Sequence, residues 1–225
     1  MQNDAIGKYR ALCCTNHLLR YYRGAGFIVA VVDGPLYDYK DSLIFFDSVF
    51  VVPPIYDNSY YGVRIHEITE MQVANMGNYA HGNQPAQHMI YLYDYCGQPH
   101  KTQWRVREVM DRLYSARPDG YCGDEDNGQT SAWYVFSALG FYPVCPASDE
   151  YAVGLPPFRK AVIHLENGND IMIEAPENCP ANRYVGKMTV DGKNLEQPFF
   201  NYSEINKSAK IRFEMKDIPD KSNAR

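Results

Sequence analysis

A helical region of this chain ends, and a strand-rich region begins, at the stretch Gly123-Asp124-Glu125-Asp126-Asn127-Gly128-Gln129-Thr130-Ser131-Ala132-Trp133-Tyr134-Val135-Phe136-Ser137-Ala138-Leu139-Gly140. Its aromatic and aliphatic residues predict a buried helix over about residues 127–139, which ends at Gly140. The three acids therefore lie at a helix N-terminus, where the macrodipole favours negative charge. Two interpretations stay open: an acidic cap on a core helix, or a cluster whose repulsion is offset by a cation or by a proton in transit.

The residues before this stretch have the periodicity of helices. Apolar residues three to four apart predict a helix over 63–71, and prolines at suitable first positions predict two more over 85–95 and 99–114. Helix pairs joined by short loops favour an all-α layer or a toroid. Residues 1–50 show no clear period, although Phe27–Val32 fits either a buried strand or part of a helix.

The rest of the chain has strand patterns. Two apolar runs, 161–165 and 170–174, flank Asn167-Gly168, which is a strong hairpin signal. A second hairpin is expected around Asp191-Gly192, and the alternation over 210–215 predicts a further strand. The fold class is therefore mainly α with a β tail, and the strands are expected to form an antiparallel, sandwich-like sheet.

The composition is that of an ordinary globular protein. The chain has 225 residues, 45% of them hydrophobic, and its net charge of −5 argues against nucleic acid and anionic membranes as partners. Its 19 Tyr suit sugars, because a ring offers a flat apolar face beside a hydroxyl, although they also suit a core. The six Cys form no CxxC pair, so no zinc site is indicated. Neither a secretory leader nor a membrane span is expected.

The string His66-Glu67-Ile68-Thr69-Glu70 carries the first polar grouping. It is similar to the zinc-protease pattern HExxH, but Glu70 stands where the second imidazole is needed, so zinc chemistry is not expected. Glu67 and Glu70 share one helix face, and their hard oxygens suit Ca²⁺. The alternative is an exposed charged face.

The turn His81-Gly82-Asn83 carries the second grouping. Gly82 lets the backbone approach a ligand and Asn83 offers an amide oxygen, but Asn83 would equally cap a helix start. His88, one turn later, is expected to be a core residue. An oxygen-only donor set fits Ca²⁺ and the activation of water. Its members are Glu70, Asn83, Asp124 and Asp126.

Five strings of the chain, in this order, resemble the glycoside hydrolase family 92 α-mannosidases: Ile65–Met71, Tyr79–Pro85, Gly123–Gln129, Ser131–Tyr134 and Gly140–Val144. The resemblance runs from about residue 45 to the C-terminus. It implies a divergent segment over 1–50, a partial (α/α)6 toroid over 51–140 and a β-rich region over 141–225. Family members are far longer, so we expect a C-terminal fragment whose pocket needs an N-terminal β-sandwich domain, in a secreted or periplasmic setting.

The resemblance also implies an activity, which is Ca²⁺-dependent, inverting, exo-acting α-mannosidase activity on mannose-containing glycans, as in N-glycan degradation. Carried over by residue, Asp126 is expected to be the general base, with Asp124 beside it. His66 and Glu67 are expected to contact the leaving mannose of an α-1,2 linkage. The calcium ligands are expected among Glu70, Asn83, Asp124 and Asp126.

The chain departs from the family pattern at two places. Gln84 stands where many relatives carry Glu, which removes one negative charge near the metal. Residues 1–45 lack the Gly-Asn-Ala-Trp string that carries the family's general acid. We therefore expect a weakly active or inactive chain, with a non-catalytic calcium- or mannose-binding remnant, or a ligand-free helical domain, as the alternatives. Exposed apolar patches are expected at Trp104, Trp133, Tyr134 and Phe136.

Overall fold

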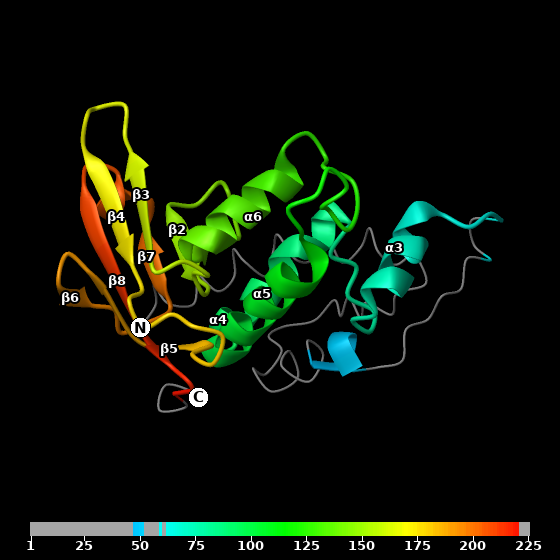
Figure 1. Ribbon diagram of the computed structural model, residues 1–225, viewed down its shortest axis with the longest axis horizontal. Helices are drawn as coiled ribbons and strands as arrows, with labels where there is room; N and C mark the ends of the chain where they lie inside the picture. The colour runs from blue at the N-terminus through cyan, green and yellow to red at the C-terminus, as the bar shows by residue number, and fades with distance from the viewer. Residues whose placement is uncertain (1–46, 52–58, 60–61, 221–225) are drawn as a thin grey trace, which may run out of the picture. The chain divides into compact units, whose positions relative to one another are not determined.

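The computed structural model describes residues 47–51, 59 and 62–220, and these fall into two units (Figure 1). Unit 1 takes its described residues from 1–89 and 112–130, and unit 2 from 90–111 and 131–225. The expectations for Phe27–Val32, and for most of the divergent segment that ends at residue 50, lie outside the described residues.

The regular elements between residues 62 and 139 are all helical. They are α3 (His66–Ala74), the 3₁₀-helix η3 (Gln84–Tyr91), α4 (Leu92–Tyr95), α5 (Pro99–Leu113) and α6 (Gln129–Leu139). The prediction of helices near 63–71, 99–114 and 127–139 is confirmed, with α5 beginning at its proline as expected. Gly140 ends α6 with a left-handed φ of 93°. No described helix has both the length and the apolar character that crossing a bilayer requires.

The prediction of one α-helix over 85–95 is wrong. The chain first winds as the tighter η3 and only then makes the single α-helical turn α4. The winding starts from Asn83, whose carbonyl accepts a hydrogen bond from the Ala86 N–H at 2.9 Å, three residues ahead. A bond over three residues gives 3₁₀ geometry, which a periodicity of apolar residues does not distinguish from an α-helix.

The strands form two sheets, both in unit 2. The three-stranded sheet has the order β1 (Phe141–Tyr142), β2 (Glu150–Val153), β7 (Phe199–Asn201). The five-stranded sheet has the order β3 (Lys160–His164), β4 (Asp170–Glu174), β8 (Ala209–Lys216), β5 (Tyr184–Val190), β6 (Lys193–Asn194). A short helix, α7 (Tyr202–Ile205), follows β7.

Both predicted hairpins are confirmed. β3 pairs antiparallel with β4 around Asn167-Gly168, and β5 pairs with β6 around Asp191-Gly192 (Figure 1). Asp191 and Gly192 both have left-handed backbones, with φ of 49° and 79°. Two successive positive φ values suit a two-residue hairpin, because their twist matches that of the flanking strands.

The expectation of a purely antiparallel tail is wrong for one pair, because β4 and β8 are parallel, with Ile173 beside Ile211. β8 enters the sheet last, between β4 and β5, and runs antiparallel to β5. A parallel neighbour needs a long connection, and here the chain passes through β5, β6 and β7 before β8 begins. A period-two pattern predicts the buried face of a strand but not the direction of its neighbour.

The two sheets share one hydrophobic core. Phe141 and Phe200 come from the three-stranded sheet, and Ile211 and Phe213 from the five-stranded sheet. Phe136, near the end of α6, packs on the same cluster. A core shared by two sheets is the arrangement of a small sandwich.

The expected exposure of apolar side chains holds for Trp104, which is 41% exposed, but is wrong for Trp133, which is fully buried. Trp133 lies within α6, where the run of apolar residues already predicts a buried helix.

Candidate functional site

Two loops of unit 1 meet backbone to backbone at Gly82 and Gly123. A Cβ atom at Gly123 would lie 2.5 Å from Gly82 Cα, and a Cβ atom at Gly82 would lie 2.7 Å from the Cys122 carbonyl oxygen. Real Cβ atoms do not approach other atoms so closely, so this contact requires two glycines. The crossing joins the His81-Gly82-Asn83 turn to the acidic loop, two segments that the sequence alone treats separately.

The carboxylate of Glu70 lies at this crossing. Its Oε2 atom would be 2.7 Å from a Cβ at Gly82 and 2.8 Å from a Cβ at Gly123. Burial raises the pKa of Glu70, and the carboxylates of Asp124, Glu67 and Asp126 raise it further, whereas His66 lowers it. The smaller contributions of these three carboxylates indicate that their charges act on Glu70.

His66 stands between two of these acids. Its Nε2 atom is 3.4 Å from Glu67 Oε1 and 3.6 Å from Asp124 Oδ2. The side chains of His66 and Asp124 are 53% and 68% exposed, so the ion pair adds little stability. The same exposure leaves both side chains accessible to a ligand.

The three consecutive acids have different roles. Glu125 closes the turn that leads into α6, because its Oε2 accepts a hydrogen bond from the Gly128 N–H at 2.5 Å and its carbonyl accepts one from the Thr130 N–H at 3.1 Å. Asp124 and Asp126 remain exposed. Asp126 is also left-handed, with φ of 53°. Glu125 is thus engaged with the backbone just before the helix, whereas its two neighbours present exposed charges.

A buried pair of side chains supports the acidic loop. Gln87 Nε2 donates to Thr130 Oγ1 at 3.0 Å, and the Thr130 hydroxyl donates to the Asp124 carbonyl at 2.8 Å. Gln87 Nε2 also lies 3.4 Å from the His81 carbonyl oxygen. Gln87 and Thr130 are both fully buried. The pair therefore connects the acidic loop with the turn that carries Gly82. Sequence reasoning missed Thr130, whose only signal is a polar residue in the first turn of an apolar helix.

His81 is a fixed, neutral residue. Its Nδ1 is 2.7 Å from the Tyr79 hydroxyl and its Nε2 is 2.8 Å from the Tyr114 hydroxyl. Burial lowers the pKa of His81 to about 3, so the imidazole is uncharged at neutral pH. The two tyrosines hold the ring just before Gly82, and nothing in the sequence marked them for this role.

Asn83 lies at a helix start and His88 lies in the core, as the interpretations without a ligand predict. Asn83 precedes η3, its N–H donates to the Ala80 carbonyl at 3.0 Å, and its own carbonyl accepts from Ala86. The contacts described for Asn83 are these backbone bonds, and none joins its side chain to the acids. His88 is buried, as expected of a core residue, and burial lowers its pKa to about 4.

The donor chemistry of the cluster fits calcium. Within the described residues, no three His, Cys, Asp or Glu side chains are already gathered in the geometry of a metal site. Glu70, Asp124 and Asp126 nevertheless offer oxygen atoms alone, which is the donor type that Ca²⁺ prefers. The repulsion that raises the pKa of Glu70 is also what a divalent cation would relieve.

Comparisons with known proteins point to one family. The sequence model described as the glycosyl hydrolase family 92 catalytic domain matches residues 45–217. A curated relative, an uncharacterized secreted glycosidase from Arthroderma benhamiae, is 27% identical over 125 residues. That alignment covers 54% of this chain and 16% of the relative.

Solved structures are similar over most of the chain but over a small part of their own length. The inverting family GH92 mannosidase BT2199 from Bacteroides thetaiotaomicron is 47% identical with a TM-score of 0.68, over 83% of this chain and 25% of that one. The GH92 α-mannosidase BT3965 from the same organism, in complex with mannoimidazole, is 35% identical with a TM-score of 0.71, over 80% and 22%. The chain thus spans about a quarter of these enzymes.

Proposed function

The chain belongs to glycosyl hydrolase family 92, and from that membership we propose that it carries part of a site that hydrolyses terminal α-linked mannose in glycans. The observation that carries the proposal is that the Glu70 carboxylate lies at the Gly82–Gly123 crossing, while His66 lies near both Glu67 and Asp124 of the acidic loop. Two of the solved structures that the chain resembles are a GH92 α-mannosidase and an inverting GH92 mannosidase. The proposal extends that chemistry to this chain's own residues.

Asp126 is our choice for the general base. Its side chain is exposed, so a water molecule can approach it, and Asp124 stands beside it. In an inverting reaction, the base takes a proton from water as the water oxygen attacks the anomeric carbon, on the face opposite the leaving oxygen. The negative charges of Asp124 and Asp126 contribute to the raised pKa of Glu70, after burial, so the charges of this loop act on the carboxyl of α3.

The remaining residues position the substrate. His66 and Glu67 lie together on the first turn of α3, and we assign them to hydrogen bonds with the mannose on the leaving side of an α-1,2 linkage. Glu70, Asn83, Asp124 and Asp126 are assigned to a calcium ion. When bound, Ca²⁺ would supply positive charge that offsets the carboxylates and holds sugar hydroxyls.

The proposed architecture also rests on the membership of family 92. We assign residues 51–140 to the last helices of an (α/α)6 toroid and 141–225 to a β-rich region, in a longer secreted or periplasmic glycosidase whose β-sandwich domain completes the pocket. One curated relative is described as secreted. N-glycans are the proposed substrate class because they carry terminal α-linked mannose.

No general acid is assigned among the described residues. Without a positioned acid, the leaving oxygen departs without protonation, which lowers the rate by about 10²–10⁴. The tested chain is therefore expected to release mannose slowly. The second candidate function is a non-catalytic calcium- or mannose-binding remnant. The lack of an assigned general acid favours it, because the exposed cluster needs no acid to bind calcium or mannose.

Mannose release from α-1,2-linked mannobiose tests the proposal, with the purified chain in Ca²⁺ and then in excess chelator. Slow release that stops with chelator and in Asp126→Asn supports the hydrolase. The matched control is Glu166→Gln, an exposed acid in the β3–β4 turn, which keeps the wild-type rate. Release that persists unchanged in Asp126→Asn contradicts the assignment of the base.

Calcium binding, measured by calorimetry, separates the two candidate functions. Binding that Glu70→Gln weakens at least tenfold, without any mannose release, favours the remnant. Wild-type melting that Ca²⁺ leaves unchanged contradicts both, because a ligand of the native state raises its stability by mass action.

A further inference from the structure

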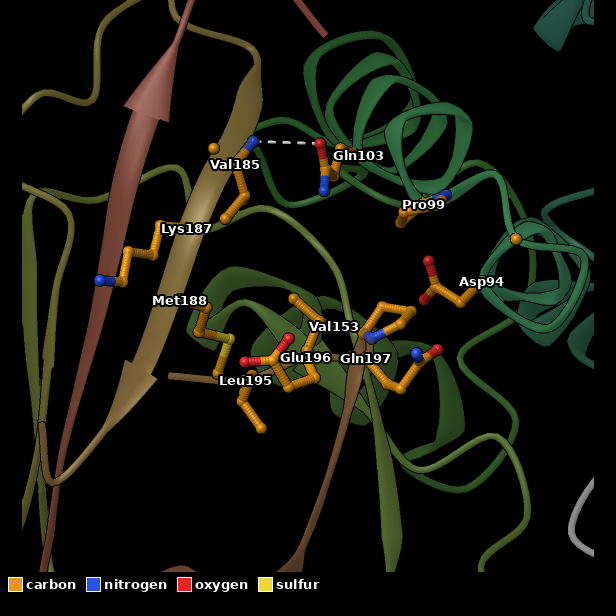
Figure 2. A pocket seen from close by; sticks show the side chains of 13 residues that line it. Asp94, Pro99, Gln103, Val153, Val185, Lys187, Met188, Leu195, Glu196 and Gln197 are labelled. Atoms are coloured by element: carbon orange, nitrogen blue, oxygen red, sulfur yellow. Dashed lines mark hydrogen bonds between the residues drawn. The ribbon is translucent and has the colours of Figure 1, made fainter. Parts of the chain in front are cut away.

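A cleft in unit 2 lies apart in sequence from the acidic cluster and has a volume of about 100 Å³. Its lining comes from α4, α5, β5 and the segment 195–198 (Figure 2). The Asp94 side chain is directed from α4 toward the middle of the cleft, between Pro99 and Gln197 (Figure 2). The proposed hydrolysis uses none of these residues.

The Asp94 carboxyl is buried without a partner. Only 3% of the residue is exposed, and neither carboxyl oxygen has a hydrogen-bond partner among the described residues. A buried carboxyl without donors is costly to a fold, and natural proteins usually satisfy such groups. Burial raises the pKa of Asp94 well above its usual range, and Glu150 adds to the rise, whereas the nearby Thr102 hydroxyl opposes it. The Thr102 hydroxyl can offer a single donor, which leaves the carboxyl without a cationic partner among the described residues.

The charge of the lining favours a cation. Glu196 adds a second carboxylate, whereas the ammonium group of Lys187 is directed away from Asp94 (Figure 2). Gln103 is already oriented, because its Oε1 accepts a hydrogen bond from the Val185 N–H at 3.0 Å. Gln103 is therefore left with its Nε2 as a donor, and the charged acceptors of the cleft are the carboxylates of Asp94 and Glu196.

The shape of the cleft favours a small head on a short apolar stem. Because Asp94 is 3% exposed, only a compact group reaches its oxygens. The walls beside it are apolar, with Val153, Met188 and Leu195 among them. A volume of about 100 Å³ holds a few heavy atoms and is well below that of a drug-sized site. A metal ion fits less well, because no cluster of three His, Cys, Asp or Glu side chains was found in the described chain.

We propose that this cleft binds a primary alkylammonium group, with the Asp94 carboxylate as its counter-ion, Glu196 as a second acceptor and the apolar wall against the alkyl stem. An ammonium group has three N–H donors, enough for both Asp94 oxygens and one further acceptor. The site goes beyond the proposed hydrolase function and does not depend on it.

Calorimetric titration of the purified chain with butylammonium chloride tests the proposal. We expect saturable binding that is at least tenfold tighter than that of 1-butanol, which has the same stem without the charge. Tetramethylammonium, which has the charge without N–H donors, is expected to bind at least tenfold more weakly as well. Equal affinity for butylammonium and butanol, or no binding of butylammonium, overturns the proposal.

Two variants locate the binding. Asp94→Asn keeps the shape and removes the buried ionisable group, so the fold is expected to persist while butylammonium affinity falls at least tenfold. Glu196→Gln, at an exposed residue of the lining, is expected to weaken binding less, and Glu166→Gln in the β3–β4 turn not at all. Wild-type affinity in Asp94→Asn overturns the proposal.

The source of the ammonium is decided by a second probe. Affinity for the Nα-acetyl methylamide of lysine that equals the butylammonium affinity supports a lysine side chain of a polypeptide. A loss of more than tenfold with that probe supports a free amine.

Discussion

The Gln87 side chain donates a hydrogen bond to the Thr130 hydroxyl at 3.0 Å, although the two residues belong to different helices, η3 and α6. Thr130 in turn contacts the acidic loop, because its hydroxyl donates a hydrogen bond to the Asp124 carbonyl at 2.8 Å. Both side chains are fully buried. A buried hydrogen bond of this kind specifies one arrangement of the loop, since breaking it leaves polar groups without water. The positions of Asp124 and Asp126 thus depend on a residue that carries no charge.

Replacement of Thr130 by Val tests this dependence. Valine has nearly the same shape but removes the hydroxyl, so the Asp124 carbonyl and the Gln87 amide each lose a partner. We expect the free energy of unfolding to fall by about 2–3 kcal/mol. Amide exchange at Gly128 and Gln129 is expected to accelerate at least tenfold. Thr130→Ser keeps the hydroxyl and should retain most of the protection. Equal exchange in the valine and serine variants would show that the hydroxyl does not hold the loop.

A methyl group at the glycine crossing is expected to disrupt the site. In Gly123→Ala, the new Cβ would lie 2.5 Å from Gly82 Cα, and backbone cannot move as a side-chain end can. We expect a loss of about 3 kcal/mol or more in urea unfolding, together with weaker calcium binding. Gly192→Ala is the control, because nothing lies within 4 Å and only its φ of 79° is unfavourable for alanine. That strain costs about 1–2 kcal/mol.

The sequence was sufficient to predict helix ends and hairpins, because the interactions that determine these features are local. Pro99 begins α5 and Gly140 ends α6, because each residue acts on its own backbone. The two hairpins follow from Asn167-Gly168 and Asp191-Gly192 for the same reason. The alternation of β8 is fully realised, with every second residue buried.

The features that were not predicted depend on residues far apart in the chain. In the parallel pairing of β4 with β8, the two strands are separated in the chain by β5, β6 and β7, and no local pattern records this pairing. The approach of Gly82 to Gly123 is a second example, because each glycine read alone fits an ordinary turn. The side chains that fix this region were not predicted: Thr130 holds the acidic loop, whereas Tyr79 and Tyr114 hold His81, and a Thr or a Tyr alone gives no signal of such a role.

The buried neutral His88 predicts how stability changes with acid. Burial lowers its pKa to about 4, whereas an exposed histidine in the unfolded chain has the ordinary pKa of 6.5. The unfolded state therefore binds a proton first as the pH falls, so stability is lost between about pH 6.5 and pH 4. The loss from this group is about 3 kcal/mol, and His81 acts in the same direction.

Unfolding midpoints measured from pH 7.5 to pH 4 check this expectation. His88→Gln removes the titrating group and should flatten the curve, whereas His164→Gln, at an exposed position beside Asp170, should leave its slope nearly unchanged. A slope in His88→Gln equal to that of the wild type would mean that His88 is protonated equally in both states.

The buried guanidinium of Arg107 supports the last prediction. Arg107 is 7% exposed, and its Nη2 donates to Asn178 Oδ1 at 2.8 Å and to the Pro156 carbonyl at 3.2 Å. These acceptors are neutral, so removing Asn178 leaves a buried charge with fewer donors satisfied. We expect Asn178→Ala to lower the free energy of unfolding by about 2–3 kcal/mol.

A matched control is Asn182→Ala, because the Asn182 side chain donates to the Glu177 carbonyl at 2.7 Å in an exposed position. An exposed bond is replaced by water, so a change within about 0.5 kcal/mol is expected there. Thermal unfolding of both variants decides the matter. Equal melting of Asn178→Ala and Asn182→Ala would show that water or another acceptor satisfies Arg107, and that Asn178 does not compensate the buried charge.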